Sequence, residues 1–266
     1  MTTINPDDPS LNETAHNTTA DEVARFSALA DKWWDQDGAF RPLHQLNPVR
    51  LAYIRDHVCA HFGRNPRQMQ PLDGLAVLDI GCGGGLIAEP LSRMGATVTA
   101  IDAASQNIEA ARAHAARDNL AIDYRDEPAE RLAERGEQFD VVISLEVIEH
   151  VADLPAFIAT CASLARPGGG LFFATLNRTA LSWLLGIVAA EYVLRWLPRG
   201  THTWKKFVRP SELVKMMRAS QLTPGDLTGV SYDPVAGSWR TSDSLAVNYM
   251  TFASRPAETG ENDQAS

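Results

Sequence analysis

The stretch VLDIGCGGG at residues 77–85 limits the possible folds most, because an apolar run leads directly into a turn crowded with glycine. Its D-x-G-x-G-x-G pattern comprises Asp79, Gly81, Gly83 and Gly85. Glycines in such a turn permit positive φ angles and let a ligand approach the backbone closely. The dinucleotide fingerprint G-x-G-x-x-G would require glycine at position 86, where this chain has Leu86, which argues against NAD. The stretch therefore predicts a buried strand, a ligand-binding turn and a helix.

Strand-like and helix-like segments alternate along the rest of the chain. Strands are expected at 74–81, 97–102, 122–126, 139–145 and 170–176, and two further β-like runs are LTGVSYDP and AVNYMTFAS. Helices are expected at 86–94, 105–119, 153–165 and 211–220. This alternation predicts an α/β fold with a doubly wound, mostly parallel sheet of seven strands. Residues 21–62 have a helical pattern and would form an N-terminal helical cap, and residues 178–207 would form a helical insertion.

Composition narrows the partners and the compartment. The formal net charge is −9, which argues against nucleic acid as the main partner because phosphate binding needs a basic surface. The three cysteines have no CxxC spacing, and the N-terminus has no basic and apolar leader, so we expect a cytoplasmic protein. Polar composition predicts disordered tails at 1–20 and 256–266, which leaves one domain at 21–255.

The glycine spacing resembles motif I of the class I S-adenosylmethionine-dependent methyltransferases. Several other blocks resemble the bacterial ubiquinone biosynthesis O-methyltransferase family. They are FRPLHQLNPVRLAYI, LEVIEHV, LARPGGGLFFATLNRT, GTHTWKKFVRP and VNYMTF, and the resemblance covers residues 21–255. Motif I is shared by the whole superfamily, whereas LHQLNPVRL and GTHTWKKF are more specific. The resemblance implies a Rossmann-like fold and O-methylation of polyprenylated catechol or quinol intermediates at both O-methylation steps of ubiquinone biosynthesis.

The resemblance also implies a binding site for S-adenosylmethionine. Arg50 would contact the methionine part, Gly81 would lie beneath it, and the backbone near Leu145 would line the same pocket; an arginine suits a carboxylate because its guanidinium can bind both oxygens. Asp102 ends the second strand and can accept hydrogen bonds from a ribose diol, as acids do there in other doubly wound folds. Asp126 or Glu127, after the third strand, is the candidate for the adenine amino group.

SLEVIEH, at residues 144–150, follows the fourth strand with two acids and a histidine. If the segment forms one helical turn, Glu146, Glu149 and His150 share one face. A phenol with a pKa near 10 is mostly protonated at neutral pH, so methylation needs either a base such as His150 or a divalent cation that stabilises the anion. The three side chains could serve as metal ligands, and the resemblance favours Mg²⁺. In the alternative without metal, Glu146 lines the pocket and the others cap the next helix.

The insertion at 178–207 is apolar and rich in tryptophan, and it runs into a basic segment. From Arg195 to Arg218 there are seven basic side chains and one acid. An apolar helix beside a basic cluster is typical of an interfacial anchor on anionic lipid, which predicts peripheral association with the inner membrane and admission of an isoprenoid tail. The alternative is a lid helix buried on the sheet.

Two other functions remain open. One is a different small-molecule methyltransferase, on carbon or oxygen, with the same fold. The other is a non-catalytic, cofactor-binding membrane scaffold for other ubiquinone-biosynthesis proteins.

Overall fold

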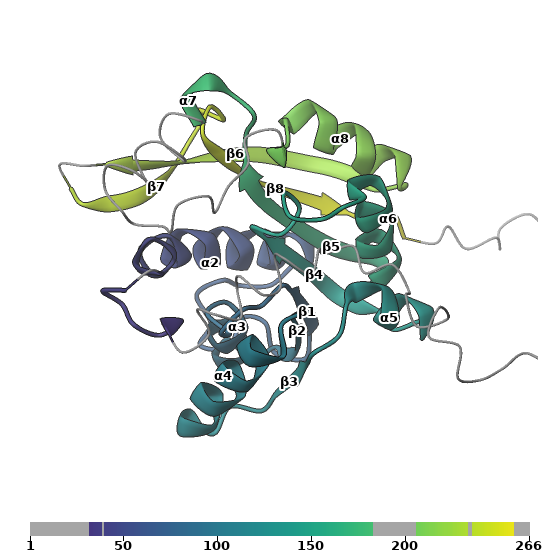
Figure 1. Ribbon diagram of the computed structural model, residues 1–266. Helices are drawn as coiled ribbons and strands as arrows, with labels where there is room; N and C mark the ends of the chain where they lie inside the picture. Colours follow the sequence, from purple (N-terminus) through teal and green to yellow (C-terminus); the bar gives the residue numbers. More distant parts are fainter. Residues whose placement is uncertain (1–31, 39, 183–205, 234–235, 258–266) are drawn as a thin grey trace, which may run out of the picture.

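The computed structural model describes residues 32–38, 40–182, 206–233 and 236–257, and in these residues one sheet of eight strands forms the centre of the molecule (Figure 1). The strands are β1 (Ala76–Ile80), β2 (Thr97–Ile101), β3 (Ile122–Arg125), β4 (Phe139–Leu145), β5 (Ala165–Leu176), β6 (Thr223–Asp233), β7 (Ser238–Ser242) and β8 (Asn248–Ser254). Their order across the sheet is β3-β2-β1-β4-β5-β8-β6-β7.

The sheet is parallel from β3 to β5 and antiparallel from β5 to β7. The chain winds outward from β1 to β3, returns to the other side of β1 as β4, and then continues to β5. The switch point therefore lies between β1 and β4, where ligands bind in open α/β sheets at the carboxyl ends of the strands.

Seven strands were expected from the sequence, and β7 is the eighth. Its sequence, SWRTS, is short, and its only large apolar side chain is Trp239, so it gives almost no periodic signal. It pairs only with β6, for example Tyr232 with Trp239. The two C-terminal runs form β6 and β8 as expected, but β8 lies between β5 and β6.

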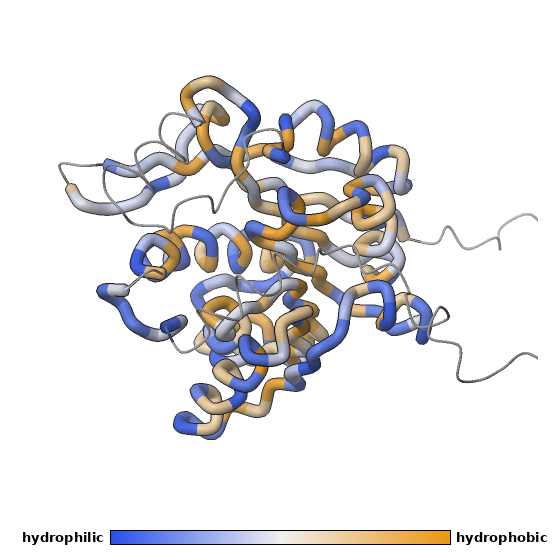
Figure 2. Tube along the Cα trace, in the orientation of Figure 1, coloured by the Kyte–Doolittle hydropathy of each residue, from blue (hydrophilic) through white to orange (hydrophobic). Residues whose placement is uncertain are grey.

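Helices cover both faces of the sheet (Figure 1). They are α2 (Arg41–His61), α3 (Ala88–Arg93), α4 (Ser105–Ala115) with the short helix η3 (Ala116–Asp118), α5 (Ala129–Glu134), α6 (Leu154–Leu164), α7 (Ala180–Ser182) and α8 (Pro210–Ala219). One hydrophobic core joins α2, α3 and α4 to the sheet, and a second joins α5, α6 and α8 to its other face. Figure 2 shows the apolar strands between these two helical layers.

Of the N-terminal cap predicted at 21–62, residues 21–31 and 39 lie outside the described residues. Residues 32–38 contain turns and no α-helix, and the helix α2 begins at Arg41 with proline in its first turn. Proline suits the first turn of a helix because the amide hydrogen it lacks has no partner there. Trp33, Phe40 and Leu86 form a third, small apolar cluster next to the glycine turn.

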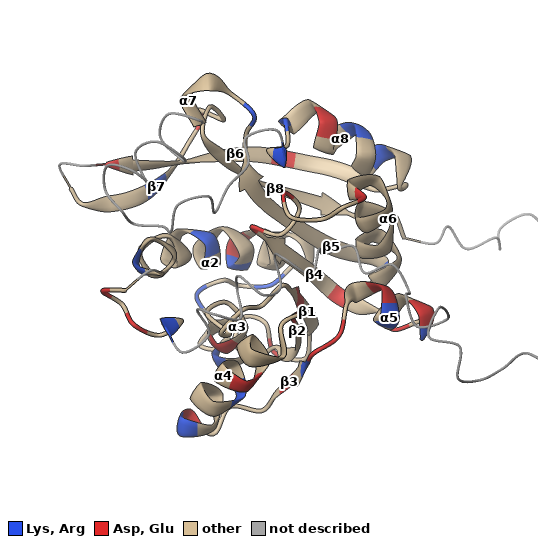
Figure 3. Cartoon of the chain, viewed as in Figure 1, with Lys and Arg blue, Asp and Glu red and all other residues tan. Residues whose placement is uncertain are grey.

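Charged side chains lie mainly on the outer helices and loops, and the central strands are almost free of them (Figure 3). Among the described helices, none is both long and apolar enough to cross a membrane. Most of the predicted 178–207 insertion and nearly all of both predicted tails lie outside the described residues.

Candidate active site

The glycine turn joins β1 to α3 at the switch point. Gly81, Gly83 and Gly85 have positive φ angles of 72°, 53° and 87°. A Cβ atom at Gly81 would come within 2.4 Å of Val147, in the loop that follows β4. The turn is fixed to β2, because the amides of Gly81 and Cys82 donate to the carbonyl of Ile101 at 2.8 and 3.0 Å. The turn therefore has the open, rigid backbone that close binding of a ligand requires.

Asp102 follows β2 and lies against this turn. Its Oδ2 accepts from the Gly83 amide at 3.0 Å, and its Oδ1 accepts from the Ala104 amide at 2.9 Å and from Asn107 Nδ2 at 3.1 Å. Burial raises the pKa of this carboxyl, and the three hydrogen bonds oppose that rise. The structure thus brings Asp102 to the glycine turn, where its predicted role requires it.

Asp79 lies beneath the turn and is 2% exposed. Burial, and then the charge of Asp102, raise its pKa to about 7. Its Oδ2 has no hydrogen-bond partner in the part of the chain that the structure describes. A buried carboxylate oxygen without a donor is costly, and a cationic or donating group of a ligand would stabilise it.

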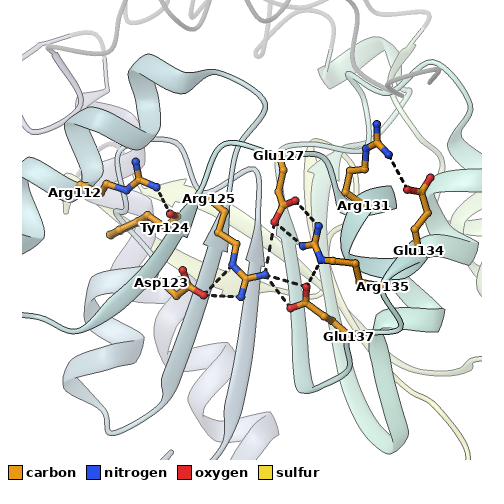
Figure 4. A network of polar contacts seen from close by, with 9 residues as sticks. All are labelled: Arg112, Asp123, Tyr124, Arg125, Glu127, Arg131, Glu134, Arg135 and Glu137. Carbon is orange, nitrogen blue, oxygen red and sulfur yellow. Dashed lines mark hydrogen bonds and ion pairs between the residues drawn. The ribbon is translucent and has the colours of Figure 1, made fainter. Parts of the chain in front are cut away.

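Asp126 and Glu127 follow β3 in different environments. Glu127 belongs to an ion-pair network (Figure 4), in which both of its oxygens accept from Arg135 at 2.7 and 2.8 Å and Arg125 lies 3.6 Å away. Glu137 connects the same two arginines. Asp126 is exposed. Because the Glu127 carboxylate already has strong partners, Asp126 is the better of the two candidates for an adenine contact.

Arg50 and Glu146 form an ion pair between α2 and the end of β4. Arg50 is 4% exposed, and a buried arginine must have a partner. Glu146 has a φ angle of 57°, and its amide donates to the carbonyl of Ala174 on β5 at 2.9 Å. This left-handed backbone turns Glu146 out of the strand and towards α2. Leu145, the last residue of β4, is half-buried and packs against the same core as α2.

Glu149 and His150 lie in the turn after β4. Glu149 is 2% exposed; its Oε2 accepts from Thr175 Oγ1 at 2.8 Å, and its Oε1 has no hydrogen-bond partner. Burial, and then the charge of Glu146, raise the pKa of Glu149 to about 7, while His150 and Thr175 oppose the rise. His150 is also buried, and its amide donates to the Val147 carbonyl at 2.8 Å.

Glu146 and His150 both act on the pKa of Glu149, but the three side chains are not arranged as one metal-binding group in this structure. The α-helical turn expected over 146–150 does not form. Glu146 has a left-handed backbone, and a tight turn follows it in which the His150 amide donates to the Val147 carbonyl. Glu146 pairs with α2 on one face of the sheet. Glu149 binds Thr175, which follows Ala174 and so points to the other face, the one covered by α6 and α8. Among the described residues no group of three or more His, Cys, Asp or Glu side chains is arranged to hold a metal ion.

Besides the Arg50–Glu146 ion pair, three further contacts at the site were not foreseen from the sequence. Thr175 binds Glu149, Asn107 binds Asp102, and Trp33 packs on the glycine turn. The paired tryptophans at 33 and 34 were visible as an aromatic signal near the N-terminus, but nothing in the sequence indicated where they pack.

Comparison with known proteins shows the class of the fold. A family described as a methyltransferase domain matches residues 78–173. Among solved structures, the magnesium protoporphyrin IX methyltransferase of Synechocystis PCC 6803 with bound SAH is similar, with a TM-score of 0.57 and 17% identity over 88% of this chain and 99% of that one. A S-adenosylmethionine-dependent methyltransferase from Aquifex aeolicus has a TM-score of 0.54 at 11% identity, over 88% of this chain and 98% of that one. The fold is that of the class I methyltransferases.

Curated relatives identify the family within this class. The chain is 56% identical to a ubiquinone biosynthesis O-methyltransferase of Sinorhizobium fredii, over 92% of this chain and all of the relative. It is 55% identical to one from Chelativorans sp., over 91% of this chain and 96% of the relative. The protein therefore belongs to the ubiquinone biosynthesis O-methyltransferase family.

Proposed function

We propose that the protein methylates a catechol or quinol hydroxyl of polyprenylated ubiquinone precursors, at both O-methylation steps, with S-adenosylmethionine as the methyl donor. The observation that carries this proposal is the identity of more than half of the residues over about nine-tenths of the chain to enzymes of that name. The site agrees with it, because the glycine turn, Asp102, Arg50 and the acids after β4 all lie at the carboxyl edge of the sheet.

The residues at the switch point fit the cofactor. Asp102 would accept hydrogen bonds from the ribose hydroxyls, and the turn from Gly81 to Gly85 would lie beneath the methionine part. The oxygen of Asp79 that has no partner suits a cationic amino group. Arg50, which pairs with Glu146 in this structure, would bind the carboxylate of the cofactor. Asp126 would contact the adenine amino group.

The cofactor supplies a methyl group activated by a sulfonium charge, so the protein mainly has to position the acceptor and remove its proton. We assign proton removal to His150, whose side chain lies in the turn directly after β4. The Glu149 carboxylate, which Thr175 holds in place, would stabilise the imidazolium that forms, because the two groups carry opposite charges.

In this structure Glu146 and Glu149 each have a protein partner, Arg50 and Thr175. Among the described residues no group of three such side chains is arranged to hold a metal ion. The proposal therefore assigns proton removal to His150 and includes no step on a divalent cation. The requirement for a cation is a direct question for experiment.

Methylation of a short-chain demethylubiquinol, with and without EDTA, tests the proposal. We expect turnover that EDTA leaves unchanged, and loss of turnover in His150→Gln with cofactor binding retained. Glu134→Gln, an exposed ion-pair residue on α5, is the matched control and should behave as wild type. If activity returned only after a metal was added, the proposal of proton removal by His150 would be replaced by a metal-assisted step. Methylation of a carbon nucleophile alone, or cofactor binding without any turnover, would favour the two alternative functions.

We further propose that residues 178–207 bring the enzyme to the cytoplasmic surface of the inner membrane, where its isoprenoid substrates reside. The apolar sequence beside seven basic side chains supports this proposal. Deletion of residues 181–197 should abolish sedimentation with anionic liposomes. Unchanged sedimentation would mean that the insertion serves another purpose.

A further inference from the structure

The indole of Trp33 packs directly on the glycine turn. Trp33 is 7% exposed and stacks on Phe40 with ring centroids 3.8 Å apart. A Cβ atom at Gly83 would lie 2.5 Å from the outer edge of the indole, and one at Gly84 would lie 2.4 Å from its inner end. These two positions therefore lack side chains partly because the Trp33 side chain occupies the space that a Cβ atom would need.

A chain of hydrogen bonds leads from this indole to Asp102. Trp33 Nε1 donates to Asn107 Oδ1 at 2.9 Å, and Asn107 Nδ2 donates to Asp102 Oδ1 at 3.1 Å. An indole can only donate and a carboxylate can only accept, so a single orientation of the Asn107 amide satisfies both neighbours. Asn107 is 1% exposed, which leaves it no water with which to exchange these bonds.

The contacts of Asp102 leave part of its carboxylate available. Its two oxygens offer about four acceptor positions, of which the protein fills three. Two of the three donors are backbone amides fixed by the turn and by the start of α4. The third is Asn107, whose orientation depends on Trp33. Removal of the indole N–H would leave the buried Oδ1 of Asn107 without its donor, so the amide would no longer be held at the carboxylate from both ends.

We propose that Trp33 and Asn107 are positioning residues for Asp102, which orient its carboxylate so that the remaining acceptor position recognises the cofactor ribose. This inference rests on the ribose contact of the proposed function. It gives the N-terminal segment, which lies outside the matched methyltransferase domain, a share in cofactor recognition. It also predicts that the effect of Trp33 is specific to the ribose hydroxyls.

Trp34 provides a matched control within the same segment. Its Nε1 donates to the carbonyl of Gly84 at 2.9 Å, and its ring stacks on His114 with centroids 3.4 Å apart. Trp34 therefore anchors the segment to the same turn but has no hydrogen bond to Asn107 or Asp102 among those that the structure describes. If the segment contributed only packing, substitution of Trp33 and of Trp34 would have the same effect on cofactor binding.

The test is calorimetric binding of S-adenosylhomocysteine and of its 2′-deoxyribose analogue to wild type, Trp33→Phe and Trp34→Phe. Wild type should prefer the ribose form by about 10-fold or more, as expected for a hydrogen bond to a charged group. Trp33→Phe keeps the stacking on Phe40 but should lose most of this preference, with little change for the analogue. Trp34→Phe should weaken both ligands by the same factor and keep the preference. Asn107→Ala should reproduce Trp33→Phe.

Three results would overturn the inference. Equal loss of preference in both tryptophan variants would indicate docking of the whole segment. A preference unchanged in Trp33→Phe would refute the positioning role alone and leave the proposed function intact. A wild-type protein that binds the two ligands equally would remove the ribose contact itself, and the inference with it. Thermal unfolding of each variant separates these outcomes from loss of the fold.

Discussion

Two carboxylates at the same edge of the sheet, the half-buried Asp102 and the buried Glu149, have very different surroundings. Asp102, at the end of β2, accepts three hydrogen bonds from the protein, two of them from backbone amides. Glu149, after β4, accepts one from the side chain of Thr175, and its other oxygen has no partner among the described residues. Burial raises the pKa of both. At Asp102 three hydrogen bonds oppose that rise, whereas at Glu149 it is opposed by the charge of His150, the residue's own backbone amide and Thr175.

The difference matches two tasks. A group that binds a ligand repeatedly should keep one charge and one orientation, which fixed backbone donors provide. A group that assists proton transfer works best with a pKa near the working pH. Burial gives a carboxyl such a pKa, because it disfavours the charged form. Under the proposed function, the β1–β3 half of the sheet would bind the cofactor, and the turn after β4 would carry the reactive groups.

Glu149→Gln should have the largest effect on this comparison. Turnover should fall about 100-fold, the size typical of a lost acid–base group, while the cofactor dissociation constant changes less than about 2-fold. Steady-state kinetics at saturating cofactor, combined with calorimetry, measure both quantities. A variant with normal turnover would mean that the unpartnered oxygen of Glu149 has no part in the reaction.

Asp102→Asn should show the opposite pattern. Loss of the charged acceptor should weaken cofactor binding about 30-fold, and turnover at saturating cofactor should remain within about 3-fold of wild type. The same two measurements apply. If Asp102→Asn lowered turnover and left binding intact, the assignment of the two halves of the sheet would have to be reversed.

Stability should depend on pH through Glu149. Its pKa is about 7 in the folded protein and near 4.5 when unfolded, so the folded state binds the proton more tightly. The stabilisation is therefore fully present below about pH 4.5 and is lost as pH rises through about 7. Glu149→Gln should remove on the order of 3 kcal/mol of this dependence.

Urea unfolding at several pH values measures this effect, with Glu134→Gln as the control that should follow wild type. Asp79, whose pKa is also about 7, should leave a residual slope in the Glu149 variant. A slope identical in Glu149→Gln and wild type would contradict the raised pKa.

The smallest effect is expected at Glu127. Its carboxylate is held by Arg135 and lies near Arg125, so Glu127→Gln should change cofactor affinity less than about 2-fold, because ion pairs near the surface contribute little. Asp126→Ala should weaken binding more. A larger effect at Glu127 would return the adenine contact to that residue.

Much of the fold was predictable because its signals are local. The alternation of strands and helices, the glycine turn and the position of Asp102 each depend on residues close in the sequence. The failures are contacts between distant residues. Arg50 meets Glu146 across 96 positions, and Trp33 meets Asn107 across 74. The left-handed backbone of Glu146 also has no signature in SLEVIEH. The contacts of this residue are with Ala174 on β5 and Arg50 on α2, which are distant in the sequence.

The place of β8 has a consequence for how the chain is made. Among the described strands β8 comes last along the chain, yet it lies between β5 and the hairpin of β6 and β7. During translation the hairpin therefore has no edge to join until residues 248–254 have left the ribosome. Until then β5 presents an unpaired apolar edge, which is prone to pairing with other chains. A nascent chain stalled before residue 248 should be a strong client for chaperones, and release of the last seven-residue strand should end that dependence.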